Sequence, residues 1–598
     1  MKPVVVALLA LAGAGCSVEG GDGQAGGCAG GCAAAAPAAL SVAEVQRIVA
    51  QAANEAQARG AAATIAVVDR VGNVLAVFRM NGAAPTFIIT SARGVSGGLE
   101  GLAGLPAELG AISKAITGAY LSSEGNAFSS RTAGQIVQEN FNPGEVNAPG
   151  GPLFGVQFSS LTCSDVVRTG AGVGAGPKGA PLGLSADPGG LPLYKAGSLV
   201  GGIGVIADGV YGIDLDVGDV DADLDELIAV AGSQGFAAPA TRRGERILVD
   251  GRSLRFVDSE ALRADPAAAP PFGALPGALV DVPGFFSPPA VVAGAAYGTA
   301  ASGYRPATHP AFAGLDAFVL DDGAGNARFA PIAGTDGLMT QAEVTAILAE
   351  ALRVANRTRA QIRQPLGSSA QVSVAVVDTE GALLGLVRTP DAPVFGTDVA
   401  VQKARTAAFF SRPDSAAALA GAGTYVADLQ AIIPGALTNG IAYGARTVGN
   451  LARPFLPDGI NGRPPGPLSK PFSAWSPFAT GLQLDLVIGR LLAPAPGDCT
   501  ALPRIRNGIQ IFPGAVPIFR GSTLVGAIGI SGDGVDQDDL IAFLGLARAG
   551  RALGTGIANA PAARRADTIA VPGGQLRYVA CPVAPFLDSN ETNVCAGL

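Results

Sequence analysis

Charged side chains are scarce in this chain, and histidine is almost absent. Asp, Glu, Lys and Arg together make up 15% of the 598 residues, where about 25% is usual. The net charge is −8, and the basic residues form no cluster that could neutralise a run of phosphates, which argues against nucleic-acid binding. The one histidine, His309, lies in a Pro-rich stretch, and no G-x-S-x-G motif is present. A Ser-His-Asp nucleophile and a zinc site are therefore both disfavoured.

The N-terminal residues have the composition of a bacterial export signal. Residues 1–16 read MKPVVVALLALAGAGC, an apolar run after one lysine, which predicts a signal peptide rather than a membrane span. The run LAGAGC resembles a lipobox, although Gly13 stands where a branched residue is usual; Cys16 is a candidate for lipidation, and ordinary cleavage nearby is the alternative. Residues 17–40 are rich in Gly and Ala and predict a disordered tether. We expect a lipoprotein of the cell envelope, in the periplasm or outer membrane and touching the membrane only through its lipid, or a secreted protein.

Six cysteines follow Cys16, an even number that permits disulfides in an exported chain. Cys581 and Cys595 are close enough in sequence to close a C-terminal loop, and Cys28 with Cys32 could close a small one. The pairing of the six stays open at this stage. The six are Cys28, Cys32, Cys163, Cys499, Cys581 and Cys595.

The chain is a tandem duplication. Residues 65–79, IAVVDRVGNVLAVFR, align without a gap on residues 374–388, VAVVDTEGALLGLVR, and Asp69 falls on Asp378. In each copy the aspartate can accept bonds from backbone amides, and the glycine three residues later can take positive φ at little cost, which predicts a short hairpin turn. Four further pairs keep the same order in both copies, at residues 127–136 and 442–451, 142–153 and 456–468, 191–205 and 516–530, and 238–257 and 560–579.

Helix signals mark the start of each copy. Ser41 with Glu44 three residues later forms a capping-box pattern before apolar positions at helical spacing, which predicts a helix to about Arg59. A similar apolar stripe predicts a helix over residues 340–363, and residues 112–138 predict a helix, a turn and a helix. These patterns divide the chain into a first domain over 41–260, a Pro/Gly-rich linker over 261–339, a second domain over 340–580 and a tail over 581–598.

The ordered motifs resemble the GlcG/HbpS family of haem-binding-type domains. They comprise the opening helix, the AVVD-x-x-G hairpin, a KA-x-T-A helix at residues 403–407, a GG-x-P strand and a VGAIGISG strand. The resemblance covers residues 41–231 and 340–551. It implies an α/β (α+β) fold of two tandem profilin-like domains, each a roughly five-stranded antiparallel sheet flanked by helices. It also implies a small planar or anionic ligand, haem first, and either a homo-oligomer or a pairing of the two domains within one chain.

A haem ligand is harder to place than the fold. Haem iron generally takes His, Cys, Met or Tyr as axial ligand, and His309 lies in the linker. Tyr194 lies in the GG-x-P strand of the first copy, but Phe519 replaces it in the second. Tyrosine ligation would therefore be confined to one copy, with Tyr194 as the candidate.

Recurring cations are the other candidate ligand-binding residues. Lys114 and Lys403 take the same place in the KA helix, where a cation could meet a propionate, carboxylate or phosphate group. A structural salt bridge is the alternative for both lysines. Arg405, in the same motif as Lys403, is a further candidate.

Arg131 and Arg446 recur in an R-T-x-G motif and could hold an anion in a guanidinium fork. Buried pairing with Glu145 or Asp458 is the alternative. The ligand-binding set is therefore Lys114, Arg131, Tyr194, Lys403, Arg405 and Arg446.

Two further patterns are weighed against plainer interpretations. A run of aspartates over residues 208–225 could hold Ca²⁺ through oxygen ligands, but it lacks the central glycine of an EF-hand, and a solvated loop leading into a helix cap is the alternative. Glycines at 189–190 and 201–204 lie within predicted strands and lack the strand-to-helix context of a dinucleotide site. Close approach of backbones explains these glycines better.

These observations favour an exported haem-binding or related small-molecule-binding protein without catalytic activity. One alternative is an enzyme acting on a small oxo- or hydroxy-acid, because Asp69, Lys114 or Glu145 could transfer a proton. The other is a structural or assembly module, which the apolar strands and low charge would suit. Fold alone does not decide among these classes.

Overall fold

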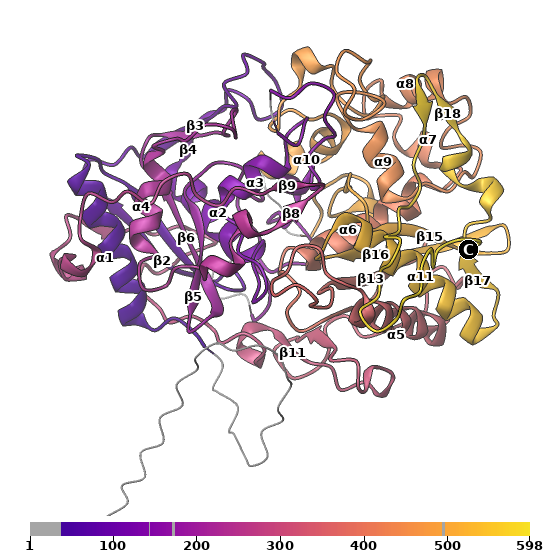
Figure 1. Cartoon of the computed structure of the whole chain (residues 1–598), viewed down its shortest axis with the longest axis horizontal. Helices are drawn as coiled ribbons and strands as arrows, with labels where there is room; N and C mark the ends of the chain where they lie inside the picture. The colour runs from indigo at the N-terminus through magenta and orange to yellow at the C-terminus, as the bar shows by residue number, and fades with distance from the viewer. Residues whose placement is uncertain (1–37, 143, 170–173, 493–496) are drawn as a thin grey trace, which may run out of the picture. The chain divides into compact units, whose positions relative to one another are not determined.

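The computed structural model describes residues 38–142, 144–169, 174–492 and 497–598 (Figure 1). The predicted signal peptide with Cys16, and the cysteines Cys28 and Cys32, lie outside the described residues. Among the described helices, none is both long and apolar enough to cross a membrane. Residues 38–598 form one compact unit that contains both copies of the repeat.

The first copy opens as its sequence predicts. Helix α1 (Val42–Ala58) starts with the expected capping box, in which Ser41 Oγ accepts a bond from the Glu44 amide and the Glu44 carboxylate accepts one from the Ser41 amide. Strands β1 (Thr64–Asp69) and β2 (Val74–Met80) then pair antiparallel. Every residue of β1 is buried, so both faces of the sheet are covered.

The two predicted Asp-turn-Gly hairpins are confirmed. Asp69 Oδ1 accepts bonds of 3.0 Å from the amides of the second and fourth residues after it, and Asp378 Oδ1 accepts the equivalent bonds at 3.0 and 2.9 Å. Gly72 has φ 84° and Gly381 has φ 78°, a region that favours glycine. The turns are local, which is why the sequence alone predicts them.

The first sheet has five antiparallel strands in the order β10-β2-β1-β6-β5. Its other strands are β5 (Gly190–Lys195), β6 (Ser198–Ile206) and β10 (Gly277–Leu279). Helix α2 (Ala107–Tyr120) covers one face, and α1 with α4 (Leu224–Gly232) covers the other. This is the predicted architecture for the first domain.

The glycines of β6 let α2 lie close to the sheet. A Cβ atom at Gly202 would lie 2.2 Å from the carbonyl oxygen of Ala115, and one at Gly204 would lie 2.1 Å from that of Ala111. Neither distance is possible for a real side chain, so only glycine fits. Close approach of backbones, rather than nucleotide binding, is thus what these glycines provide.

The second sheet repeats the arrangement with strands β13 (Ser373–Val377), β14 (Leu383–Arg388), β15 (Ala515–Arg520) and β16 (Thr523–Ser531). Its order is β11-β12-β14-β13-β16-β15-β17, so the central order β14-β13-β16-β15 matches β2-β1-β6-β5 of the first. This sheet has seven strands rather than about five, because β11 and β12 come from the linker and β17 from the C-terminal part. Helix α6 (Gly396–Phe410) covers one face, and α5 (Gln341–Arg357) with α11 (Val535–Leu553) covers the other.

Two predicted boundaries are wrong. The second opening helix ends at Arg357 rather than residue 363, because Thr358 leaves the helical region with φ −73° and ψ 129°. Helix α2 begins at Ala107, before the predicted residue 112. Shorter elements complete the described chain: β3 (Thr86–Ile89), β4 (Ala103–Pro106), α3 (Ser130–Ile136), β7 (Val210–Tyr211), β8 (Leu248–Val249), β9 (Arg252–Ser253), β11 (Tyr304–Pro306), β12 (Phe318–Leu320), α7 (Ser415–Ala418), α8 (Tyr425–Ile432), α9 (Ala445–Leu451), α10 (Leu482–Leu492), β17 (Ile557–Asn559), β18 (Ala570–Val571) and β19 (Gly574–Gln575).

The hydrophobic core has a shared inner part and separate outer parts. Along β1, Ile65 and Val67 face α1 and α4, whereas Ala66 and Val68 face α2, as the period of two in a strand requires. The second sheet alternates in the same way. The residues facing α2 and those facing α6 belong to one continuous cluster, so the two copies share their inner core.

The linker packs on both sheets. It adds β10 to the edge of the first sheet and β11 with β12 to the second. Phe286 and Tyr304 are buried, as expected for aromatic residues that would be costly to expose. Disulfides join Cys581 to Cys595, a pairing anticipated from their spacing, and Cys163 to Cys499, which was not anticipated.

Candidate functional site

Lys114 and Lys403 are both buried and ion-paired. Lys114 Nζ lies 2.5 Å from Asp187 Oδ2 and 2.6 Å from Asp225 Oδ2. Burial opposes its charge, but the two carboxylates outweigh burial and raise the pKa of Lys114. Lys403 Nζ has one carboxylate partner, Asp538 Oδ2 at 2.9 Å, and burial lowers its pKa. The salt-bridge interpretation accounts for both lysines, and a ligand would have to displace these carboxylates.

The difference between the two lysines has a local cause. Phe512 takes the place in the second copy that Asp187 has in the first, and its ring lies 4.4 Å from Lys403 Nζ. A cation over an aromatic face is stabilised, but less than by a second buried carboxylate. Burial raises the pKa of Asp187, and Lys114 only partly offsets this rise.

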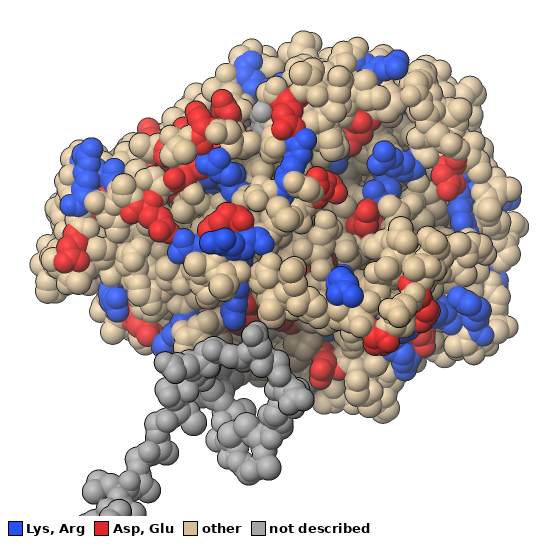
Figure 2. All heavy atoms as spheres, viewed as in Figure 1, with Lys and Arg blue, Asp and Glu red and all other residues tan. Residues whose placement is uncertain are grey.

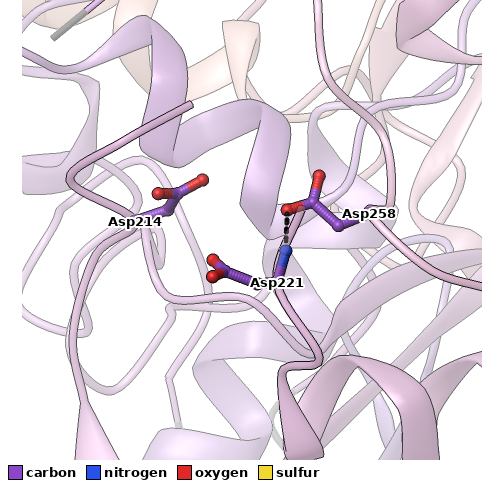
Figure 3. Close-up of side chains that lie close together, drawn as sticks. All are labelled: Asp214, Asp221 and Asp258. Carbon is purple, nitrogen blue, oxygen red and sulfur yellow. Dashed lines mark hydrogen bonds between the residues drawn. The ribbon is translucent and has the colours of Figure 1, made fainter. Parts of the chain in front are cut away.

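Arg131 fills the centre of the acidic cluster that the sequence run suggested for Ca²⁺. The carboxylate oxygens of Asp214, Asp221 and Asp258 lie within 4.8 Å of one another (Figure 3), and Asp258 Oδ2 accepts a bond of 3.0 Å from the Asp221 amide. Arg131 Nη1 lies 2.8 Å from Asp214 and Asp258 and 3.4 Å from Asp221. Its Nε donates to Glu226 Oε1 at 2.7 Å. A guanidinium therefore already supplies the positive charge in this cluster.

Arg446 has the equivalent position in the second copy. Its Nε donates to Asp539 Oδ2 at 2.5 Å, and Nη2 pairs with Asp536. The partners considered from sequence, Glu145 and Asp458, are wrong. Those two carboxylates lie elsewhere on the surface loops, and their partners are Arg252 and Arg453 respectively.

In each copy the lysine and the arginine meet at one helix start. Lys114 and Arg131 bind the consecutive residues Asp225 and Glu226 at the beginning of α4. Lys403 and Arg446 bind Asp538 and Asp539 near the start of α11 in the same way. The predicted recurrence of these cations thus corresponds to a repeated pair of buried ion pairs.

The structure places Tyr194 and Arg405 away from those pairs. The Tyr194 hydroxyl donates to the carbonyl oxygens of Ser123 and Asn126, and burial raises its pKa, so it stays protonated. Arg405 binds both carboxylate oxygens of Asp165 from the first copy, at 2.8 and 2.7 Å. Arg405 therefore joins the two copies to each other.

A cavity of about 710 Å³ lies beside the first hairpin turn. Three stretches that are distant in sequence line it: the turn over residues 69–75, the residues around Arg168 and Lys178, and the linker over 284–301. Phe285, Phe286 and Val292 make part of its wall apolar. Its volume falls within the roughly 300–1,000 Å³ of small-molecule sites.

The first turn anchors this wall of the linker. Asp69 Oδ2 accepts a bond of 2.9 Å from the Ala295 amide, and the carbonyl oxygen of Leu75 accepts one of 3.1 Å from the Val292 amide. Burial raises the pKa of Asp69, while the bonds that its carboxylate accepts lower it. Asp69 is therefore a structural residue of the turn that also borders the cavity.

Arg168 and Lys178 were not candidates in the sequence, although a signal for them exists. They lie in a Gly-rich stretch of the first copy, and residues 166–186 contain no acidic residue. A Gly-rich stretch that carries two cations and no carboxylate between Asp165 and Asp187 is the pattern that could have marked them.

The equivalent turn of the second copy is covered differently. A Cβ atom at Gly381 would lie 2.2 Å from the carbonyl oxygen of Arg504. Arg504 pairs with Glu380 and Asp414 at 2.9 Å each, and Arg412 pairs with the same two carboxylates at 2.9 and 2.8 Å. Balanced ion pairs therefore occupy the place where the first copy has cations beside a cavity.

Elsewhere the charges are mixed. On the face in Figure 2, Lys and Arg are spread among Asp and Glu, with uncharged residues between them. That face presents no continuous basic surface.

The residues that match a known protein family lie in both repeats of the chain. The family model described as "Haem degrading protein HbpS-like" matches residues 40–93, 347–450 and 488–547. No curated protein matches the chain by sequence.

Solved structures with similarity to the chain include protein ORFY of Klebsiella pneumoniae, which is 18% identical with a TM-score of 0.21 over 33% of this chain and 90% of that one. A PduOC:heme complex is 16% identical with a TM-score of 0.21 over 33% and 96% of the two chains. A double mutant of Streptomyces reticuli HbpS is 21% identical with a TM-score of 0.19 over 36% and 97%. The segments that match the HbpS-like family model thus lie in both repeats of the chain.

Proposed function

We propose that this chain binds haem or a related planar, anionic molecule in the cavity beside the first hairpin turn. The observation that carries the proposal is the cavity itself, about 710 Å³ in volume, with the aromatic rings of Phe285 and Phe286 and the cations Arg168 and Lys178 in its lining. Apolar walls suit the faces of a large ring, and cations suit its carboxylates. The HbpS-like family, whose description names haem, adds support.

The lining fits such a molecule in size and charge but offers no usual ligand for its iron. No His, Cys, Met or Tyr is among the described residues that line the cavity. Among such side chains elsewhere, His309 is exposed and its Nδ1 caps a short helical turn by accepting a bond from the Ala311 amide. Asp69 Oδ1 and Oδ2 are engaged by backbone amides and Asn73.

We propose further that the chain binds its ligand without degrading it, and that it works outside the cytoplasm. The absence of an iron ligand from the described lining favours binding over chemistry at iron. The two disulfides favour an oxidising compartment. The alternative of an enzyme built on Lys403 gains no support, because that side chain is fully buried against Asp538.

The test is a hemin titration of the full chain followed by absorption spectroscopy. We expect saturable binding that shifts the Soret band. After a reductant is added, the Soret absorbance of the bound ligand should decay no faster than that of free hemin. Absence of saturable binding would refute the proposed function. Faster loss of the band in the presence of the protein, slowed by Arg168→Gln, would instead show that the protein degrades haem and refute binding without turnover.

A further inference from the structure

Arg168 is the cation best placed to receive an anion in the cavity. Its side chain lines the cavity, its Nε is buried without a hydrogen-bond partner, and within the described part of the chain it makes no ion pair. Lys178 lines the same cavity, and its Nζ donates to the carbonyl oxygen of Gly174 at 2.5 Å. An unpaired guanidinium nitrogen that water does not reach is costly unless an acceptor is supplied.

The surroundings of Arg168 and Lys178 carry an excess of positive charge. Burial and the neighbouring Arg168 lower the pKa of Arg328 to about 10, although Tyr304 and Asp165 raise it. Burial also lowers the pKa of Lys178, which Asp69 raises and Arg168 and Arg328 lower. The nearby carboxylate of Asp165 is bound by Arg405 in a two-pronged contact. A bound anion would therefore relieve repulsion among three cations.

Among the described residues that line the cavity, iron has no comparable partner. Tyr120 lies beside the turn, since a Cβ atom at Gly72 would lie 2.7 Å from its hydroxyl. That hydroxyl is already bonded to the carbonyl oxygens of Val71 and Lys178, and burial raises its pKa well above the usual value. The stretch over residues 166–186 contains no His, Cys, Met or Tyr.

We propose that the cavity recognises its ligand through carboxylate groups and ring faces and is indifferent to the metal at the ring centre. This inference rests on the proposed function and specifies its chemistry: the ligand class is a planar aromatic ring system with acidic side groups, with or without iron. Arg168 and Lys178 bind the carboxylates, and Phe285 and Phe286 pack on apolar ring surface. The site is confined to the first copy, because Arg504 and its ion pairs occupy the equivalent place in the second.

The experiment compares three probes on the full chain: hemin, metal-free protoporphyrin IX, and the dimethyl ester of protoporphyrin IX, which lacks free carboxylates. Binding is measured by ligand absorption and by fluorescence of the protein's single tryptophan. We expect hemin and protoporphyrin IX to bind with dissociation constants within about threefold of each other and one molecule per chain, and the ester to bind at least tenfold more weakly. Arg168→Gln is expected to weaken hemin and protoporphyrin IX alike, by about tenfold.

The matched control is Arg504→Gln, at the equivalent turn of the second copy, which should leave all three affinities unchanged. If none of the probes binds, the proposed function fails. If hemin binds and protoporphyrin IX does not, the proposed function stands and this inference is overturned, as it is if the ester binds as tightly as the free acid. Equal weakening by Arg504→Gln and Arg168→Gln, or two molecules bound per chain, would overturn the placement in the first copy alone.

Discussion

Cys163 of the first copy is joined by a disulfide to Cys499 of the second, across 336 residues of sequence. Both cysteines are fully buried. The shared inner core is thus reinforced by a covalent link that closes most of the chain into a loop.

We expect loss of the Cys163–Cys499 disulfide to destabilise the fold more than loss of the C-terminal Cys581–Cys595 disulfide. In the chain-entropy account, a disulfide stabilises by restricting the unfolded chain, by about 3 kcal/mol for a loop near 15 residues and about 5 kcal/mol for loops of 100 residues or more. The double variant Cys163→Ser with Cys499→Ser should lower the melting temperature more than Cys581→Ser with Cys595→Ser, whose loop spans a sequence separation of 14. Calorimetry on both variants checks the order, and a larger drop for the C-terminal pair would contradict it.

Asp391 should make the junction between the copies sensitive to acid. It accepts bonds from Arg70 and from the Glu124 amide of the first copy, and pairs with Arg363 of the second. Burial would raise its pKa, but Arg70 and Arg363 outweigh burial and lower it below the usual 3.8. The unfolded chain therefore binds this proton first, so the contribution is present above about pH 4 and is lost as pH falls through the folded pKa.

Asp391→Asn is expected to remove that contribution, about 3 kcal/mol for a broken buried pair, when unfolding is measured at pH 7. The difference from the native chain should shrink as pH is lowered from about 5 to 2. Glu591→Gln is the control, because Glu591 forms an exposed ion pair with Arg357. This variant should change the free energy of unfolding little. A difference that stays constant down to pH 2 would show that Asp391 contributes through packing rather than charge.

Replacing Arg131 should turn its acidic cluster into a cation site. Arg131→Ala leaves Asp214, Asp258 and Glu226 buried or half-buried without their cation, at a cost of about 3–5 kcal/mol. Added Ca²⁺, which prefers carboxylate oxygens, should then raise the melting temperature of the variant and leave the native chain unchanged. Arg446→Ala is the control, because Arg446 pairs with Asp536 and Asp539; this variant should be destabilised without a response to Ca²⁺. Stabilisation of the native chain by Ca²⁺ would mean that the cluster binds metal despite Arg131.

As pH rises, Lys114→Met should lower the free energy of unfolding more than Lys403→Met does. The first variant leaves Asp187 and Asp225 beside each other, and burial together with their mutual repulsion raises the pKa of both. Carboxyls with a raised folded pKa keep a proton that the unfolded chain releases near pH 4, so stability falls as pH rises from about 4 through the folded pKa. The second variant leaves Asp538 beside the ring of Phe512. Denaturant unfolding between pH 5 and 8 should show the steeper decline for Lys114→Met, and equal slopes would contradict the role given to Asp187.

The parts of the fold that depend on neighbours in sequence were predictable. The Ser41 capping box and the Asp69 and Asp378 turns involve atoms a few residues apart, so the pattern of residue types determines them. The duplication predicted that both sheets share a strand order. It did not predict the extra strands of the second sheet, because β12 pairs with β14 through only one residue pair and comes from the linker.

The candidate site was less predictable, for two reasons. Recurrence drew attention to Lys114 and Lys403, but recurrence is equally a property of residues that hold a fold together, and the deciding fact is burial against Asp225 and Asp538. The cavity, in contrast, forms where three segments of the chain meet. Arg168 lies outside the motifs that recur in both copies, so comparison of the copies could not reveal it.

The continuous inner cluster between α2 and α6 has a consequence for how the copies can change over time. Residues on an exposed helix face can be substituted with little constraint. Residues on the inner faces of α2 and α6, in contrast, must stay compatible with side chains of the other copy, about three hundred positions away in the sequence. The second copy can therefore lose a pocket of its own and still be retained, because it completes the interior against which the first copy folds.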